Sequence, residues 1–288
     1  MDYARPEALV STEWLARHLD DPAIRIVDGT YFMPAMKRDA PAEFAARHIP
    51  GAVHFDIDRI AAEGTELPHM LPTPERFAEA VGALGIGNRH RIVVYDQFGL
   101  MTAARVWWMF RVFGHDAVAV LDGGLPKWLA EGRPVASGPA EPAPERFAVG
   151  FRPALVRSAD QVEANIGMQA EQLVDARAAG RFTGTDPEVW PGRRSGHVPG
   201  SRNVPFTDLL EGDGRMRPAD ALARRFGEAG IAGGRPLVAS CGSGVTACVV
   251  ALGLHLLGRD DVAVYDGSWA EWGLPGPRPV ATGPADPA

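Results

Sequence analysis

Apolar and polar positions along this chain follow two alternating patterns. Short apolar runs that fit buried strands, such as Ile24–Gly29 and Arg91–Asp96, are separated by stretches with helical spacing, such as Thr73–Leu84. Pro74 stands near the start of that stretch and Gly85 follows it, as proline and glycine do at helix ends. Strands that alternate with helices of about ten residues predict parallel sheets joined by right-handed crossovers. The pattern therefore predicts an α/β fold, with a mainly parallel sheet flanked by helices.

The same order of motifs occurs twice in the chain. Three motifs of the first copy have counterparts 149, 145 and 144 residues later: Arg47–Ala52 in Gly196–Ser201, Asp96 in Cys241, and Leu121–Gly124 in Tyr265–Ser268. Between the copies, prolines, alanines and glycines crowd together without periodicity, which is typical of a linker. We therefore predict one domain over residues 1–137, a linker over 138–152 and a second copy of the domain over 153–288.

Composition and charge narrow the class of protein. With 46 % hydrophobic and 23 % charged residues, the 288-residue chain has the composition of a globular protein with room for two cores. A net charge of −7 argues against nucleic acid or an anionic membrane as the main partner, and no apolar run approaches a membrane span of about 20 residues. Two cysteines form no disulfide framework, the first residues lack the apolar core of a signal peptide, and no metal-binding spacing occurs. We expect a cytoplasmic protein without metal or cofactor.

The chemistry centres on the stretch that begins with the apolar run Leu237–Ser240. Cys241 follows this predicted strand, Gly242 and Gly244 allow a tight loop, and a helix is expected to begin near Thr246. Loop amides and the start of a helix favour an anion, and they lower the pKa of a cysteine thiol placed there. Cys241 is therefore predicted to be a nucleophilic thiolate. The competing interpretation is a small buried hydrophobic residue, as most free cysteines are.

Other conspicuous residues have simpler structural interpretations. Cys248 lies inside the apolar helix run and is predicted to be core. Asp96 occupies the place of Cys241 in the first copy, where a carboxylate is expected to cap loop amides rather than to react. His48 and His197 precede Pro-Gly and are expected to bond the backbone of a turn. Core or interface packing is predicted for the tryptophans at 107, 108, 128, 269 and 272.

These motifs resemble a known family. The loop Cys241–Thr246, both His-x-Pro-Gly motifs and the closing Asp-Gly-Ser-Trp-Ala-Glu-Trp resemble the two-domain rhodanese-like sulfurtransferases, over about Leu9 to Trp272. The loop is most similar to that of the 3-mercaptopyruvate sulfurtransferase branch, because thiosulfate sulfurtransferases carry basic residues where this chain has neutral Gly242 and Ser243. The resemblance implies two tandem rhodanese-like domains, of which only the second is catalytic.

The resemblance also implies a reaction. Cys241 would take sulfur from 3-mercaptopyruvate, releasing pyruvate, hold it as a persulfide and pass it to a thiol, thioredoxin or cyanide. The pyruvate leaving group needs a proton, and the branch is thought to supply it through residues that match Ser243, His69 and Asp58. Taken alone, His69 would be an ordinary loop histidine and Asp58 a solvated carboxylate or helix cap.

A carboxylate donor needs a cation, and the loop backbone is expected to help bind it. Arg181 matches the first carboxylate-binding arginine of the branch, with a plain surface arginine as the alternative. The second arginine of the branch is absent, because Trp190 stands in its place; Arg193 or Arg194 could reach in instead. The remaining predicted binding residues are those of the loop: Gly242, Gly244, Val245 and Thr246.

Three alternatives stay open at this point. Thiosulfate could be the preferred donor of the same enzyme. A non-enzymatic persulfide carrier or docking module would keep the fold and the cysteine without turnover. A cysteine phosphatase uses a similar loop, but it would need arginine at position 247, where this chain has Ala247.

Overall fold

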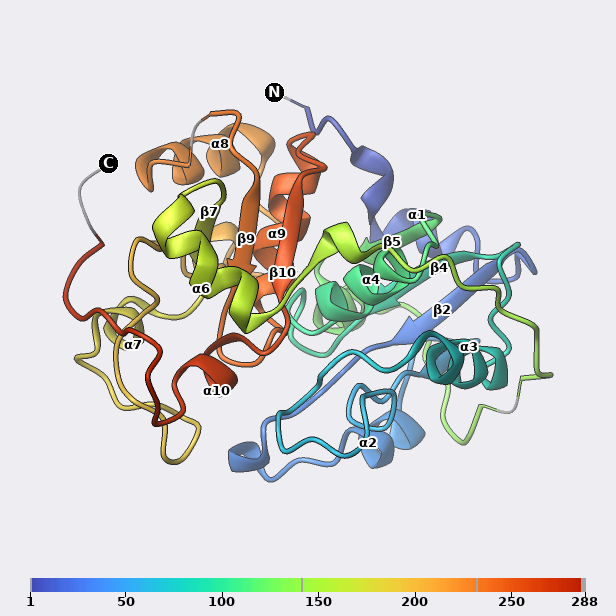
Figure 1. Cartoon of the computed structure of the whole chain (residues 1–288). Coiled ribbons are helices and arrows are strands. Elements are labelled where there is room, and N and C mark those ends of the chain that lie inside the picture. Colours follow the sequence, from blue (N-terminus) through green and yellow to red (C-terminus); the bar gives the residue numbers. More distant parts are fainter. Residues whose placement is uncertain (1, 141, 232, 286–288) are drawn as a thin grey trace.

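The computed structural model describes residues 2–140, 142–231 and 233–285, and its two halves lie side by side (Figure 1). The first half is built on a five-stranded parallel sheet in the order β1-β5-β4-β2-β3. Its strands are β1 Leu9–Val10, β2 Ile24–Asp28, β3 Ala52–His54, β4 Arg91–Tyr95 and β5 Val118–Leu121.

The second half repeats this topology. Its parallel sheet has the order β6-β10-β9-β7-β8, which matches the first sheet strand for strand. The strands are β6 Val156–Arg157, β7 Gln172–Asp175, β8 Arg202–Asn203, β9 Leu237–Ser240 and β10 Val262–Tyr265. The predicted α/β fold with two tandem copies of one domain is confirmed.

Helices connect successive strands in both halves. Those of the first half are α1 Thr12–Ala16, α2 Ala40–Ala46, α3 Pro74–Ala83, α4 Ala103–Val112 and α5 Gly124–Ala130. Those of the second are α6 Ala159–Met168, α7 Ala179–Thr183, α8 Ala219–Glu228, α9 Ala247–Leu256 and α10 Ser268–Trp272. Among the described residues, four short 3-10 helices occur, at Pro6–Ala8, Pro34–Met36, Pro153–Leu155 and Phe206–Leu209. Pro74 and Gly85 bound α3 as predicted, with Thr73 as its N-cap.

One hydrophobic cluster spans both halves, and each half has a smaller cluster of its own. Helices α4 and α9 pack against each other where the halves meet, and buried side chains of both belong to one contiguous cluster (Figure 1). The start of the chain reinforces this contact, because the Ala4 N–H donates to the Leu256 carbonyl and Tyr3 Oη donates to the Arg217 carbonyl, both in the second half. The arrangement of the halves is therefore fixed by buried apolar surface and by backbone hydrogen bonds.

Parallel pairing places the carboxyl ends of the strands at one edge of each sheet. The residue after β4 is Asp96, and the residue after β9 is Cys241. Both therefore lie at the edge where ligands bind in sheets of this kind. No described helix is both long and apolar enough to cross a membrane.

Candidate active site

Cys241 lies at the wall of a cavity of about 220 Å³ and is itself only 1 % exposed. Side chains of both halves enclose this cavity, because residues that follow β2 and β4 approach the loops that follow β7 and β9. The first half contributes Tyr31, Met33, Met101 and Thr102; the second contributes Ala176–Ala178, Arg181, Val189, Trp190, Phe206, Cys241–Ser243, Val245 and Thr246. The predicted site is thus a cavity between the halves.

The loop that carries Cys241 is held by α10. The N–H of Cys241 donates to Ser268 Oγ at 3.1 Å. The carbonyls of Cys241 and Gly242 accept hydrogen bonds from the N–H groups of Trp269 and Ala270 at 3.0 and 2.7 Å. By contrast, none of the N–H groups of residues 242–246 donates to any described residue. A run of unpaired amides beside the thiol, at the start of α9, is suited to binding an anion.

In the first half, the equivalent loop after β4 has Asp96 in place of the cysteine, and this side chain binds the loop amides. Asp96 is fully buried, and its Oδ1 accepts the N–H of Phe98 at 2.8 Å. Its Oδ2 accepts the N–H groups of Met101 and Ala103 at 2.7 and 2.8 Å. The interpretation of Asp96 as a cap of loop amides is confirmed, and an anion of the chain itself occupies that loop.

Two glycines shape the loop in different ways. Gly244 has φ +75°, and a Cβ at this position would lie 2.5 Å from the Asp266 carbonyl oxygen, so no other residue fits without a shift. Gly242 is less constrained, because a Cβ there would lie 3.4 Å from both Arg181 Nη2 and Trp190 Nε1. Gly242 therefore marks the place where the loop faces the nitrogen atoms of two cavity side chains.

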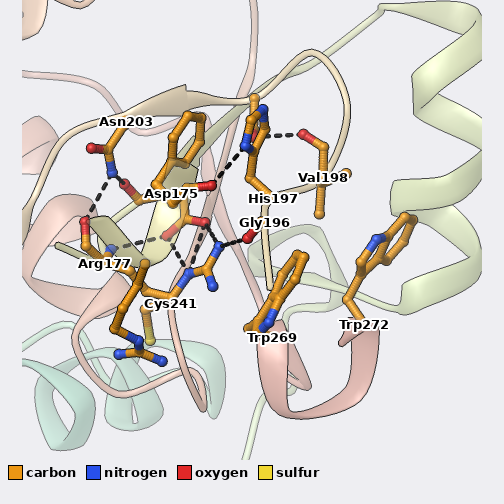
Figure 2. A network of polar contacts seen from close by, with 12 residues as sticks. Asp175, Arg177, Gly196, His197, Val198, Asn203, Cys241, Trp269 and Trp272 are labelled. Carbon is orange, nitrogen blue, oxygen red and sulfur yellow. Dashed lines mark hydrogen bonds and ion pairs between the residues drawn. The ribbon is translucent and has the colours of Figure 1, made fainter. Parts of the chain in front are cut away.

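A buried charge network lies beside Cys241 in the second half (Figure 2). Arg177 binds Asp175 through Nε and Nη2, donates to the Gly196 carbonyl at 2.7 Å and stacks on Trp269. Burial lowers the pKa of the Arg177 guanidinium, but Asp175, Glu188 and Cys241 together outweigh burial and raise it. Arg177 is thus a structural cation that stays charged.

Arg181 is joined to this network but reaches the cavity. Glu188 accepts from Arg177 Nη1 through Oε1 and from Arg181 Nε and Nη2 through Oε2. Nη1 of Arg181 makes no hydrogen bond to a described residue, and the side chain is 19 % exposed in the cavity wall. Glu188 therefore orients Arg181 and leaves one end of its guanidinium available to a ligand.

The two arginines considered as a second anchor lie elsewhere. Arg193 donates to the carbonyls of Ala270 and Pro191, and Arg194 donates to carbonyls of Trp272 and Arg278. Neither lines the cavity. The structure therefore does not bring Arg193 or Arg194 to the site, because both guanidiniums tie down the backbone around α10. Trp190 stands there instead.

His69 and Asp58 contact each other in the first half, and neither is among the residues that line the cavity. His69 Nδ1 lies 2.6 Å from Asp58 Oδ1, and the imidazole packs edge-on against Tyr31 with ring centroids 4.5 Å apart. The imidazole is 2 % exposed, whereas Asp58 is 55 % exposed. Both ring nitrogens of His69 are buried without an aligned hydrogen bond to a described residue: Nδ1 has only the close contact with Asp58, and Nε2 has no partner.

Ser243 lines the cavity, but its hydroxyl makes no hydrogen bond to His69 in the described structure. The two segments are joined through Arg105 of α4 instead. Arg105 donates to the His69 carbonyl through Nη2 and to the Gly244 carbonyl, at 3.2 Å, through Nη1. Arg105 thus holds together the segments of His69 and Ser243, and Asp58 is linked to them only through its contact with His69.

Comparison with known proteins decides the family. The rhodanese-like domain family matches residues 11–131 and 158–274, most of both halves. The chain belongs to the rhodanese-like family. Among curated relatives of this rhodanese-like protein, human 3-mercaptopyruvate sulfurtransferase is 46 % identical over 271 residues, covering 92 % of this chain and 91 % of the relative. Thiosulfate sulfurtransferase of Cricetulus griseus is 44 % identical over 272 residues, with the same coverage.

A solved structure agrees with these relatives. The crystal structure of SseA from Escherichia coli, described as a 3-mercaptopyruvate sulfotransferase, superposes on this rhodanese-like protein with a TM-score of 0.84 at 39 % identity. The match covers 92 % of this chain and 99 % of that one. The resemblance inferred from the loop and the repeated motifs is thereby confirmed.

Several structural interpretations of this rhodanese-like protein are also confirmed. His48 and His197 bond the backbone through Nδ1 as expected, but the acceptors are the helical carbonyls of Phe44 in α2 and Phe182 in α7, at 2.8 Å, rather than those of a turn. Cys248 is fully buried, donates to the Gly244 carbonyl, and has its thiol pKa raised by burial. The five tryptophans predicted to pack in the core are at most 1 % exposed.

The cavity also contains residues that sequence reasoning did not assign to it. Tyr31, Met33, Met101 and Thr102 come from the first half, and Val189 and Phe206 from the second. The position of Thr102 directly before the apolar helix run could have drawn attention to it, since the equivalent loop in the second copy is the predicted site. Nothing in the sequence singled out Tyr31 or Phe206.

Proposed function

We propose that this rhodanese-like protein is a sulfurtransferase that takes sulfur from 3-mercaptopyruvate and carries it as a Cys241 persulfide. One observation carries the proposal: the thiol lies beside unpaired loop amides, in a cavity that also contains a partly free guanidinium. The amides favour a thiolate and the charge of its persulfide, and Arg181 offers a cation to a carboxylate. The names of the human and Escherichia coli relatives support the same donor.

The reaction has two displacement steps. In the first, the Cys241 thiolate attacks the sulfur of 3-mercaptopyruvate, an S–S bond forms, and the C–S bond breaks. Its electron pair remains on the three-carbon fragment as the enolate of pyruvate, which takes one proton to become pyruvate. In the second, an acceptor thiolate attacks the outer sulfur of the persulfide and leaves with it, which restores the Cys241 thiolate. No electrons are gained or lost overall.

Proton delivery is assigned to Ser243, His69 and Asp58. Asp58 binds His69 Nδ1 and so fixes the imidazole with Nε2 toward its unpartnered side. We infer that Ser243, which lines the cavity, passes the proton between this imidazole and the departing fragment. Catalytic hydrogen bonds often tighten only when substrate is bound, so an open distance in the unliganded site is compatible with this role.

The acceptor and the setting belong to the same proposal. Cys241 lies inside the cavity, so we infer an acceptor that can enter it: a small thiol, cyanide, or a protruding cysteine of a thioredoxin-like protein. Both cysteines are free, which suits a reducing, cytoplasmic setting. A relative from Arabidopsis thaliana is named as mitochondrial, so the compartment should be tested by fractionating source cells and probing with an antibody.

Thiosulfate is the second candidate donor, because the Cricetulus relative is named for it. Both donors should be compared with one acceptor in wild type, Cys241→Ser and Arg181→Ala. We expect one added sulfur on Cys241 by mass spectrometry, no turnover in Cys241→Ser, and a larger loss of kcat/KM for mercaptopyruvate than for thiosulfate in Arg181→Ala. Arg224→Ala, on the exposed face of α8, is the matched control. Equal losses for both donors would contradict the carboxylate role, and an unmodified Cys241 would contradict the mechanism.

A further inference from the structure

Thr102 places a buried hydroxyl without a partner in the wall of the cavity. The residue is fully buried, and its Oγ1 has no hydrogen-bond partner among the described residues. It lines the same cavity as Cys241 and Ser243, although it belongs to the first half. Burying a hydroxyl removes its hydrogen bonds to water, which costs free energy unless a new partner replaces them. Such a group therefore calls for a ligand or a functional explanation.

The local structure explains why this hydroxyl is free. Thr102 is the N-cap residue of α4, and a threonine there normally accepts a hydrogen bond from the first turn of its helix. Here Asp96 Oδ2 already accepts the N–H groups of Met101 and Ala103. Thr102 has helical rather than extended backbone angles (φ −87°, ψ −24°), so its side chain makes no capping bond to α4, and its Oγ1 stays without a partner among the described residues.

We propose that Thr102 is a catalytic residue that donates a hydrogen bond from Oγ1 to the keto oxygen of 3-mercaptopyruvate. This rests on the proposed function. Thr102 comes from the first half and Cys241 from the second, so a keto acid that occupies the cavity between them meets residues of both halves. Arg181 takes the carboxylate, and the keto oxygen is the remaining acceptor of the donor.

The chemistry gives this hydrogen bond a role in the rate. When the C–S bond breaks, its electron pair spreads from the methylene carbon onto the keto oxygen as the enolate forms. A donor already in place stabilises that oxygen more in the transition state than in the bound substrate. The first half of the protein therefore contributes to the reaction through the loop in which Asp96 stands at the cysteine position.

The test compares Thr102→Val, which keeps the shape and removes the hydroxyl, with Thr102→Ser, which keeps the hydroxyl. With mercaptopyruvate, we expect kcat of Thr102→Val to fall at least tenfold with little change in KM, while Thr102→Ser stays within about threefold of wild type. With thiosulfate, which has no keto oxygen, both variants should stay close to wild type. The melting temperature of Thr102→Val should be unchanged or higher, since no hydrogen bond of the unliganded protein is lost.

A residue with a true capping bond provides the matched control. Ser158 caps α6, and its Oγ accepts the Gln161 N–H. Ser158→Ala should lower the melting temperature and leave kcat unchanged. The proposal is overturned if Thr102→Val retains wild-type kcat with mercaptopyruvate, if it loses both donors equally with a lower melting temperature, or if Thr102→Ser is as impaired as Thr102→Val. Wild-type protein that never turns over mercaptopyruvate would instead refute the proposed function.

Discussion

Arg105 of α4 and Asp266 of the segment after β10 form an ion pair across the two halves, with Nη1 to Oδ1 at 2.7 Å. The Arg105 side chain is fully buried and that of Asp266 is 5 % exposed. Burial lowers the pKa of Arg105, but the charge of Asp266, its hydrogen bond and the two nearby cysteines together outweigh burial and raise the pKa, so the guanidinium stays charged. Asp266 Oδ2 also accepts the Leu71 N–H, so the loop that carries His69 is bound to the same carboxylate as Arg105.

Removing Arg105 should therefore be strongly destabilising. Arg105→Ala leaves the Asp266 carboxylate buried without its partner, and the free energy of unfolding should fall by about 3 to 5 kcal/mol. Arg5 and Asp260 offer a matched control, because they also pair between an early segment and the second half but are 43 % and 52 % exposed. Arg5→Ala should cost less than about 1 kcal/mol. Urea unfolding measures both, and similar losses would contradict the importance of burial.

His69 can be replaced without disturbing its backbone. Its φ of +58° lies in the left-handed region, which asparagine tolerates better than most residues. His69→Asn should lower kcat with mercaptopyruvate by about 10²- to 10⁴-fold, the range for loss of a general acid. Thiosulfate turnover should change little, because departing sulfite needs no proton. Steady-state kinetics with both donors measures this difference. Equal losses of kcat with the two donors would indicate a structural role for His69 instead.

Trp190 should set the affinity for anionic donors. Its Nε1 and Arg181 Nη2 face the same point of the loop, at Gly242. Trp190→Arg adds a second charge-assisted hydrogen bond of about 1.5 to 3 kcal/mol, so KM for mercaptopyruvate should fall about tenfold to a hundredfold. Trp190→Phe keeps a ring without adding a cation and should not lower KM. An unchanged KM in Trp190→Arg would place the substrate carboxylate away from Trp190.

Asp122 should make stability depend on pH. Its Oδ1 accepts the Met216 N–H across the halves, and burial raises the pKa of its carboxyl from 3.8 to about 6. The folded protein therefore holds this proton more tightly than the unfolded chain, so this group's contribution to stability falls as pH rises from about 4 to 6. Asp122→Asn removes that loss and keeps an acceptor oxygen for Met216.

The expected gain follows from the size of the shift. At pH 7, Asp122→Asn should be more stable than wild type by about 1 to 3 kcal/mol, and near pH 4 the two should be equal. Urea denaturation across this range measures the difference. Curves that run parallel from pH 4 to pH 7 would show that the carboxyl titrates normally.

Local patterns were sufficient for the fold and for the centre of the site. Helical and strand periodicity, together with glycine and proline at the ends, located elements such as α3, and the repeated motifs revealed two copies. Cys241 was found because a strand, a glycine loop and a helix start are contiguous in sequence. Asp96 was interpreted correctly for the same reason, since its acceptor role depends on amides two to seven residues away.

What sequence could not supply is the contact between distant segments. Arg105 lies in an apolar helix run, and nothing in its neighbours shows that its charge faces Asp266, His69 and Gly244. Arg193 and Arg194 were plausible as anchors because the sequence shows positive charge near the site. The sequence does not show that backbone carbonyls around α10 hold both side chains. The free hydroxyl of Thr102 depends on the helical backbone angles of this residue, which only the folded loop shows.

The packing of α9 against α4 limits how the protein can be divided. Every residue of α9 is buried, from Ala247 to Leu256, and part of that covering comes from the first half. The second half without the first would turn this apolar helix toward water, with the cysteine loop at its start. Expressed alone, the second half should aggregate. Mixing it with the first half should give a soluble heterodimer, and activity should return only after this heterodimer has formed.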